Sequence, residues 1–484
     1  MQDNLTAKQN DYAVFLPALS SFYANYIGKQ RFDNYVDPGR MPQGIPEMEQ
    51  LNWLNSKKGL YPYRWSLYSA GHAKLDVNKD EPGEDMVRNR EEGAFLLGDS
   101  GGFQIAKGVW EGDWANPSCP RAMKKRTQLL QWMDKYMDYG MVLDIPAWSY
   151  KLEKSREKTG IKSYNDALNA TFINNDYFMQ NRTGACKFLN VLQGENHADA
   201  DHWYNMMKKY CDPAQYPDTH FNGWAMGGQN MCDVHLVLKR LVALRFDGLL
   251  EKGIHDWMHF LGTSKLEWAT LLTDIQRAVR KYHNENFTIS FDCASPFLAT
   301  ANGQMYMDVE TVDRKKWVYR MQDTADNKKY KGDTRSFRDA VTQDGIHNAF
   351  LESPVSKNLK ISDVCYYGPG DLNKLGKEGK TSWDSFSYAL LMSHNVWTHI
   401  HAVQQANREY DAGKLPGMLV QETFDQVMFR DVVEAIFATD NRDIANAVIE
   451  EYNKFWMSII GTRGATGKKT VNAQTQFTSL FEEA

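Results

Sequence analysis

Short apolar runs that stop abruptly at a small, polar or acidic residue recur along the first part of the chain. Six of them are clear, and they end at Asp99, Asp144, Gln193, Gly227, Gly262 and Asp292. Consecutive ends lie 30 to 49 residues apart, which leaves room for one strand, one crossover helix and two loops. The segments between them repeat apolar residues at spacings of three and four, most clearly at 126–137 and 234–244, as amphipathic helices do. The pattern therefore predicts buried parallel strands connected by helices.

The fold that best fits this alternation is an α/β fold, a (β/α)8 TIM barrel. Two earlier apolar runs, at 13–16 and 65–68, supply further strands. Barrel active sites lie at the C-terminal ends of the strands, so we expect the residues at the ends of the runs to converge on one pocket. A polar residue after one strand is commonplace; the prediction depends on six such ends in succession.

The pattern changes after Gly303. Residues 311–380 hold fourteen Lys or Arg against ten acidic residues and few long apolar runs. We therefore predict a barrel core at 1–310, an inserted basic subdomain at 311–382, and the last barrel helix with a C-terminal helical extension at 383–484.

Composition narrows this picture only a little. The 484 residues carry a net charge of −5 and are 42% hydrophobic, which is ordinary for a globular protein. Net acidity argues against binding nucleic acid through overall charge, but it leaves room for a local basic groove. With no secretory signal, no apolar stretch of membrane-spanning length and six scattered cysteines, we expect a cytoplasmic protein, in the host cytoplasm if the source is viral, without a membrane partner.

Two aspartates at the ends of predicted strands are candidate catalytic residues. Asp99 opens the hexapeptide Asp-Ser-Gly-Gly-Phe-Gln at 99–104, and Asp292 ends another run. A glycine pair after a strand is often only a tight turn, and a lone aspartate is often a helix cap. Together in one pocket, two carboxylates serve glycosidic bonds, one as nucleophile and one as proton shuttle. Cys293 follows Asp292, but no histidine lies at a comparable strand end, so a packed thiol is expected there.

These elements occur in the order and approximate spacing of the tRNA-guanine transglycosylases. The chain resembles that superfamily motif by motif over residues 90–305, and more faintly to residue 408. The matching motifs are the hexapeptide at 99–104, Leu-Asp at 143–144, Val-Leu-Gln-Gly at 191–194, Ala-Met-Gly-Gly at 225–228, Phe-Leu-Gly at 260–262, Phe-Asp-Cys at 291–293 and Asn-Gly-Gln at 302–304.

The resemblance implies a barrel enzyme that exchanges guanine for a 7-deazaguanine base. Asp292 is then the nucleophile and Asp99 the general acid/base. Phe103 and Leu261 would sandwich the base, and Asp144 would accept from its N–H edge. The full implied base-binding set is Ser100, Phe103, Asp144, Gln193, Gly227, Gly228 and Leu261.

The chain departs from the tRNA enzymes at two places. Leu298 and Ala301 stand where those enzymes carry arginines that contact the anticodon loop. Of the family's zinc motif only Cys365 and His394 match, with Asp363 as a further oxygen donor. A structural zinc needs four ligands, so the sequence predicts no metal site, and the chemistry requires no cofactor. His394, His399 and His401 are expected to be ordinary helix histidines.

Losing the arginines while keeping the carboxylates makes the chain most similar to the superfamily's DNA-guanine transglycosylases, found in viruses and bacterial DNA-modification islands. These enzymes place a 7-deazaguanine in DNA and so shield it from restriction nucleases. The implied partners are DNA and a free 7-deazaguanine base; a homodimer stays open. Phosphate contacts are expected from the basic segment, at Arg314, Lys315, Lys316 and Arg320. The alternatives are a tRNA-guanine transglycosylase, a non-catalytic purine or nucleic-acid-binding barrel, and a glycosidic hydrolase.

Overall fold

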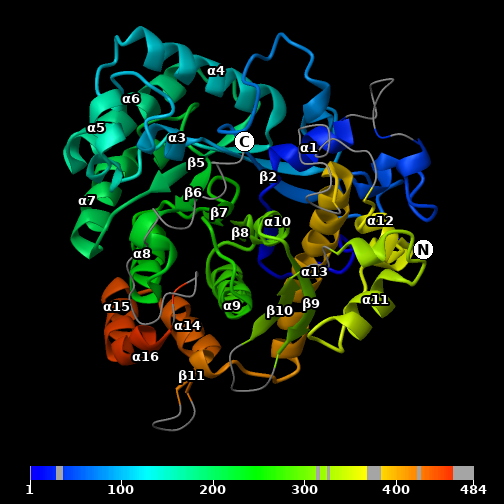
Figure 1. The fold of residues 1–484 in the computed structure, drawn as a ribbon. Helices are drawn as coiled ribbons and strands as arrows, with labels where there is room; N and C mark the ends of the chain where they lie inside the picture. The colour runs from blue at the N-terminus through cyan, green and yellow to red at the C-terminus, as the bar shows by residue number, and fades with distance from the viewer. Residues whose placement is uncertain are drawn as a thin grey trace.

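Eight parallel strands form the centre of the fold (Figure 1). The computed structural model describes residues 2–28, 36, 38–311, 317–323, 327–367, 383–421, 427–459 and 461. The strands are β1 (Val14–Pro17), β2 (Trp65–Ser69), β3 (Phe95–Asp99), β4 (Tyr139–Met141), β5 (Lys187–Leu192), β6 (Gly223–Met226), β7 (Trp257–Phe260) and β8 (Thr288–Cys293).

The strands curl into a nearly closed barrel. They follow one another in chain order from β2 to β8, and β1 pairs with β8. Ala18, just after β1, makes a parallel bridge to Leu67 of β2, which brings the two edges together. The strands are almost entirely buried, because the barrel interior fills with side chains and helices cover the outside. The predicted (β/α)8 fold is confirmed.

Helices separate successive strands. The longer ones around the barrel are α4 (Pro120–Tyr136), α6 (Tyr164–Asn181), α7 (His197–Met207), α8 (Val234–Phe246) and α9 (Leu266–Tyr282). Ser163, Asn196 and Asp233 cap α6, α7 and α8 by accepting a backbone N–H of the first turn. The predicted helices at 126–137 and 234–244 are found in α4 and α8; α4 begins earlier because Pro120 occupies its first turn.

Shorter helices shape the loops between these elements. They are α1 (Ser21–Gly28), α2 (Asp85–Arg88), α3 (Gly102–Ala106), α5 (Glu153–Thr159) and α10 (Ser295–Ala301). Both α3 and α10 start within three residues of a predicted catalytic aspartate, so the two aspartates lie where a strand turns into a helix.

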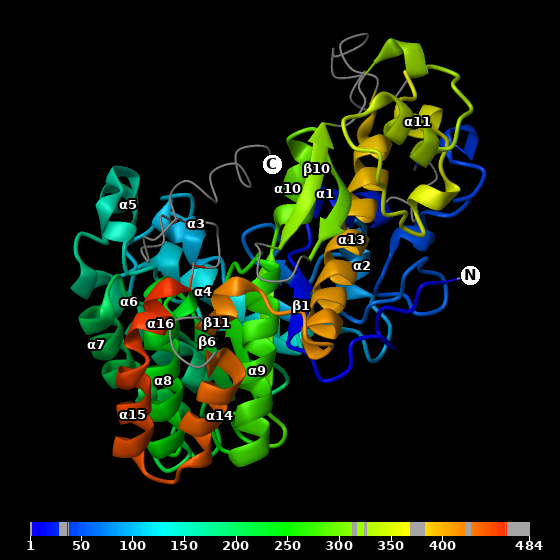
Figure 2. The same cartoon turned by 90° about the horizontal axis from the view of Figure 1, so that it is seen from below.

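A hairpin and two short helices follow α10. Strands β9 (Gln304–Glu310) and β10 (Val318–Asp323) pair antiparallel, and α11 (Phe337–Asp344) and α12 (Ile361–Val364) come next. Strand β9 packs against α10 and α13 (Ser385–Asp411), and Figure 2 shows the hairpin and α11 to one side of the barrel beside α13. The change of pattern after Gly303 therefore coincides with a change from parallel to antiparallel structure.

The last helices extend the barrel wall. They are α14 (Phe429–Ala438), α15 (Arg442–Glu451) and α16 (Asn453–Ser458), preceded by the two-residue strands β11 (Val420–Gln421) and β12 (Val427–Met428). Helix α14 packs on α9, and α15 and α16 pack on α8, as Figure 2 shows. This is the expected helical extension. No helix in the described ranges combines the length and apolarity needed to cross a membrane.

A buried ion pair joins the N-terminal part of the chain to α13. The Arg40 guanidinium donates to both carboxylate oxygens of Asp384, from Nε at 2.6 Å and Nη2 at 2.9 Å, and Nη2 also reaches the Ser387 hydroxyl. Both charged side chains are about 5% exposed. Bidentate geometry of this kind offsets the cost of burying the two charges.

Candidate active site

A cavity of about 410 Å³ lies at the C-terminal ends of the barrel strands. Its wall contains both predicted catalytic carboxylates and all but one of the predicted base-binding residues: Asp99, Phe103, Asp144, Gln193, Gly227, Gly228, Leu261 and Asp292. The remaining residue, Ser100, is buried behind the wall and donates from Oγ to Asp144 Oδ1 at 3.4 Å. The expected convergence of distant strand ends is therefore observed.

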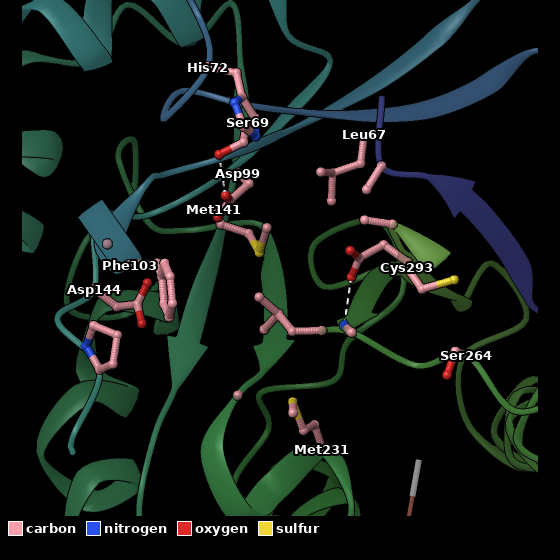
Figure 3. Close-up of a pocket in the computed structure, with 18 of the residues that line it drawn as sticks. Leu67, Ser69, His72, Asp99, Phe103, Met141, Asp144, Met231, Ser264 and Cys293 are labelled. Carbon is pink, nitrogen blue, oxygen red and sulfur yellow. Dashed lines mark hydrogen bonds between the residues drawn. The ribbon is translucent and has the colours of Figure 1, made fainter. Parts of the chain in front are cut away.

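Asp99, the last residue of β3, is held by the neighbouring strand end. The hydroxyl of Ser69, at the end of β2, donates to Asp99 Oδ2 at 2.5 Å (Figure 3). The same hydroxyl oxygen accepts from the N–H of Gly71. Desolvation raises the pKa of Asp99; the Ser69 hydrogen bond opposes this, and the charge of Asp292 raises the pKa further. Asp99 is thus disposed to carry a proton.

Asp144 lies deeper in the same wall. Its side chain accepts from Gln193 Nε2 at 2.7 Å and from the Ser100 hydroxyl, and the residue is buried. Burial raises the pKa of Asp144 to about 7, against the lowering effect of the Gln193 hydrogen bond and with a further contribution from Asp99. The carboxylate form of Asp144 is therefore only partly compensated by these two hydrogen bonds, as suits a group that accepts N–H donors from a ligand.

Asp292 has different surroundings. It lies within β8, one residue from the strand end, and its Oδ1 accepts from the backbone N–H of Gly262 at 2.7 Å and contacts His259 Nε2 at 3.2 Å. Its side chain is 15% exposed toward the cavity. Within the described residues, no hydrogen bond reaches Oδ2, which leaves one carboxylate oxygen available for reaction.

Aromatic and apolar side chains line part of the cavity. Phe103 lines it on one side, with the Trp148 ring edge-on at 5.8 Å between centroids, and Leu261 lines it from the end of β7. In Figure 3, Phe103 and Asp144 lie together on one side of the cavity and Cys293 lies on the other. A planar ring that enters here meets carboxylate acceptors at its edge and a stacking face beside it.

Glycines allow the backbone segments to approach closely. A Cβ on Gly102 would lie 2.1 Å from the carbonyl oxygen of Asp144, so only glycine fits at the start of α3. Gly228 has a left-handed φ of +55°, and a Cβ there would lie 2.4 Å from the carbonyl oxygen of Gly194. The glycine pairs therefore fix the loops that carry Asp144 and Gln193.

Cys293 contacts His399, which the sequence predicted to be an ordinary helix histidine. His399 of α13 places Nε2 3.5 Å from the Cys293 thiol, and its ring stacks on Phe15 and Tyr319. Burial lowers the pKa of His399 to about 3, which makes it a poor base. The pair thus fits the expected packed thiol better than a nucleophile.

Other residues of the site were also missed. Ser69 and His72 line the Asp99 side, Trp148 backs Phe103, and His259 supports Asp292. Ser69 follows the predicted strand at 65–68, so the rule of strand ends would have found it. His259 is a polar residue inside a buried strand, a weaker signal that its apolar neighbours concealed.

Of the two residues that replace arginines of the tRNA enzymes and the four predicted to contact phosphate, the structure describes three. Leu298 of α10 lines the cavity, and Ala301 is half-buried at the end of the same helix. Arg320 of β10 forms an ion pair with Glu310. Arg314, Lys315 and Lys316 lie outside the described residues.

The two remnants of the zinc motif have other partners. Cys365 is buried, and His394 is hydrogen-bonded through Nδ1 to the Ser353 hydroxyl at 2.9 Å and through Nε2 to the carbonyl of Tyr306 at 2.8 Å. With both ring nitrogens engaged, His394 has none free for a metal. Among the residues that the structure describes, no group of three His, Cys, Asp or Glu is placed to hold one.

Comparison with known proteins adds no assignment. No family of known proteins matches this chain, and no curated protein sequence matches it.

Proposed function

We propose that this protein is a DNA-guanine transglycosylase, which replaces guanine in DNA by a 7-deazaguanine base and so protects the DNA from restriction nucleases. One observation carries the proposal: two carboxylates, Asp99 and Asp292, share one cavity but have different surroundings. Double displacement needs this difference, because the nucleophile must be ionised while its partner carries a proton.

The first half-reaction releases guanine. Oδ2 of Asp292 attacks the anomeric carbon, and the bond from that carbon to guanine breaks with its electron pair moving to the base. Asp99 donates a proton to a ring nitrogen of the departing guanine and becomes ionised. The product is a covalent ester between Asp292 and the deoxyribose.

The second half-reaction restores the DNA strand. The incoming 7-deazaguanine gives its ring N–H proton to Asp99, and its nitrogen forms the new bond to the anomeric carbon. The ester bond breaks, and its electron pair returns to Asp292. Asp99 ends protonated and Asp292 ionised, as both began, so the cycle consumes no cofactor.

Base selection is assigned to the cavity residues around Asp144. Asp144 accepts from the N–H edge of a guanine-like base, and Phe103 and Leu261 cover its two faces. Gln193 Oε1 is buried and has no hydrogen-bond partner within the described residues, so it offers a further acceptor. Unpaired buried groups cost about 1–3 kcal/mol each, which disfavours bases without matching donors.

DNA is favoured over tRNA by one apolar residue of the cavity wall. Leu298 lines the cavity at the position where the tRNA enzymes carry an arginine for the anticodon backbone. In a duplex the anomeric carbon is covered by stacked neighbours, so the target guanine must be flipped out or the substrate must be single-stranded.

Radiolabelled guanine tests the proposal directly. Incubation with DNA and, separately, with tRNA is expected to label DNA only, and Asp292→Ala is expected to abolish labelling. Asp218→Ala, which removes an exposed carboxylate between α7 and β6, should behave as wild type. Denaturation during turnover should trap a protein-linked DNA band that Asp292→Asn does not form. Label in tRNA alone would assign the tRNA activity instead, and full exchange by Asp292→Ala would refute the mechanism.

A further inference from the structure

A polar ladder runs through the barrel interior beneath Asp292. Its members alternate between adjacent strands: Trp257 and His259 on β7, and Ser290 and Asp292 on β8. His259 is paired in register with Ser290. Because side chains two residues apart on a strand share a face, all four side chains lie on the same side of the sheet and lead to the cavity.

Hydrogen bonds link the ladder in one direction. Trp257 Nε1 donates to Ser290 Oγ at 2.8 Å, Ser290 Oγ lies 2.9 Å from His259 Nδ1, and His259 Nε2 lies 3.2 Å from Asp292 Oδ1. An indole only donates, so the Ser290 oxygen serves as acceptor there and keeps its own hydrogen to give. An ionised carboxylate only accepts, so the proton of the imidazole must lie on Nε2.

These two constraints determine one arrangement. The Ser290 hydroxyl donates to Nδ1, and Nε2–H donates to Asp292. The opposite tautomer would set a bare nitrogen against the carboxylate, and a charged imidazolium would leave the hydroxyl hydrogen of Ser290 without an acceptor. Both Ser290 and His259 are fully buried, where an unpaired polar group is costly. The neutral Nε2–H imidazole satisfies every member.

We infer that His259, oriented by Ser290, is the positioning residue for the nucleophile Asp292. The inference rests on the proposed function and extends it. His259 and the Gly262 N–H both donate to Oδ1, so the carboxylate cannot rotate freely and Oδ2 stays directed at the cavity.

The same two donors act at each half-reaction. When Oδ2 bonds to the anomeric carbon, Oδ1 becomes the carbonyl oxygen of the ester and keeps both hydrogen bonds. When that bond breaks, the electron pair returns to the carboxylate and negative charge develops on Oδ1. Donors already in place stabilise this charge without reorganisation. His259 takes no proton in either step.

Substitutions that separate the two ring nitrogens test the inference. The amide nitrogen of glutamine reaches the position of Nε2, whereas that of asparagine reaches the position of Nδ1. His259→Gln is expected to retain kcat within about fivefold, while His259→Asn and His259→Phe lose about 10- to 100-fold, with KM for guanine within about twofold of wild type. His255→Gln, which alters a buried imidazole bonded to the Cys211 carbonyl, is the matched control and should keep full activity.

A spectroscopic measurement tests the inferred tautomer of His259 without measuring catalytic activity. In protein labelled with ¹⁵N-histidine, the resonances that vanish in His259→Gln should report a proton on Nε2 and none on Nδ1. A proton on Nδ1, or on both nitrogens, would overturn the inferred arrangement. A wild-type protein without exchange activity would refute the proposed function, and the role in catalysis with it. An active wild type with an equally active His259→Phe would refute the positioning role alone.

Discussion

At the scale of single residues, the cavity separates three aspartates by their surroundings. Asp99 and Asp144 are desolvated and have raised pKa values, whereas Asp292 lines the cavity with two donors on its Oδ1. Such separation lets one pocket hold a proton donor, a ligand acceptor and a nucleophile together. The chemistry of each group can therefore be tested through its own titration or substitution.

Guanine binding should depend on pH through Asp144. Burial raises the pKa of this carboxyl to about 7, and the N–H donors of the proposed guanine ligand would bind its ionised form. Below pH 7 binding must release a proton, so the association constant is expected to rise about tenfold per pH unit and to level off above pH 7. Calorimetric titration with guanine from pH 5 to 8 measures this slope. Asp144→Asn should remove it, and a flat wild-type profile would contradict the assignment.

Ionisation of Asp144 should also lower the stability of the protein as the pH rises above about 4. Its pKa rises from an ordinary 3.8 to about 7 on folding, so the folded state holds the proton more tightly than the unfolded chain. The contribution of this proton to the free energy of unfolding is therefore complete below pH 4 and is lost as the pH rises to 7. Asp144→Asn is expected to raise Tm at pH 8 by about 3 °C and to leave it nearly unchanged at pH 4. Scanning calorimetry measures Tm at both pH values. The control is Asp218→Asn, at an exposed position; an equal rise in its Tm at pH 8 would show that burial of Asp144 is not the cause.

At the scale of elements, strand ends and the turns that follow them place the site. The sequence predicted this part well, because a polar or small residue lies at the end of most buried strands or within three residues of it, and parallel strands share one functional end. The exact ends were harder to predict. Strand β4 stops at Met141, and Asp144 lies in an irregular segment against the start of α3. Contacts between loops distant in sequence determine such ends, and apolar periodicity does not report them.

Gly102 tests the contact between α3 and the Asp144 segment. Gly102→Ala would direct a methyl group at the Asp144 carbonyl oxygen, 2.1 Å away in the present backbone, so one segment must move. The free energy of unfolding is expected to fall by about 1–3 kcal/mol, and guanine affinity by more than about tenfold. Urea unfolding and calorimetric titration measure the two effects. Gly184→Asn is the control for binding: its φ of +88° adds backbone strain, but the new side chain enters open space and Gly184 does not line the cavity, so guanine affinity should not change. Normal guanine binding by Gly102→Ala would show that the contact does not position Asp144.

The residues that contact Asp292 and Cys293 could not be predicted from the sequence. The strand positions and the resemblance placed Asp99, Asp144 and Asp292 in one pocket, but His259 and His399 were not foreseen as partners. His259 is brought to Asp292 by the pairing of β7 with β8, and His399 reaches Cys293 from a helix more than a hundred residues away. Register and long-range packing are properties of the folded chain, so neither contact can be read from local pattern.

At the scale of the whole molecule, several cations of the basic segment at 311–380 form ion pairs with carboxylates. Within its described part, Arg320 pairs with Glu310, Arg335 with Asp333 and Asp344, and Arg338 with Asp339 and Glu352. An excess of cations in the sequence is thus partly neutralised in the fold. Any phosphate that binds such an arginine must compete with a carboxylate, which weakens the contact and lowers its salt dependence.

Glu310 therefore limits how strongly Arg320 can bind DNA. Glu310→Gln removes the competing charge, and the affinity for single-stranded DNA at low salt is expected to increase about two- to fivefold. Arg320→Ala should have the opposite effect, and both changes should disappear at high salt.

The matched control for this comparison is Glu434→Gln. It removes the same charge from α14, where Glu434 pairs with Lys281 on the outer surface of α9. Fluorescence anisotropy across a salt series compares the variants. Equal gains for both glutamate variants would indicate a general effect of net charge. No gain for Glu310→Gln would remove Arg320 from the DNA-binding surface, because an arginine that contacts phosphate must respond when its competing carboxylate is lost.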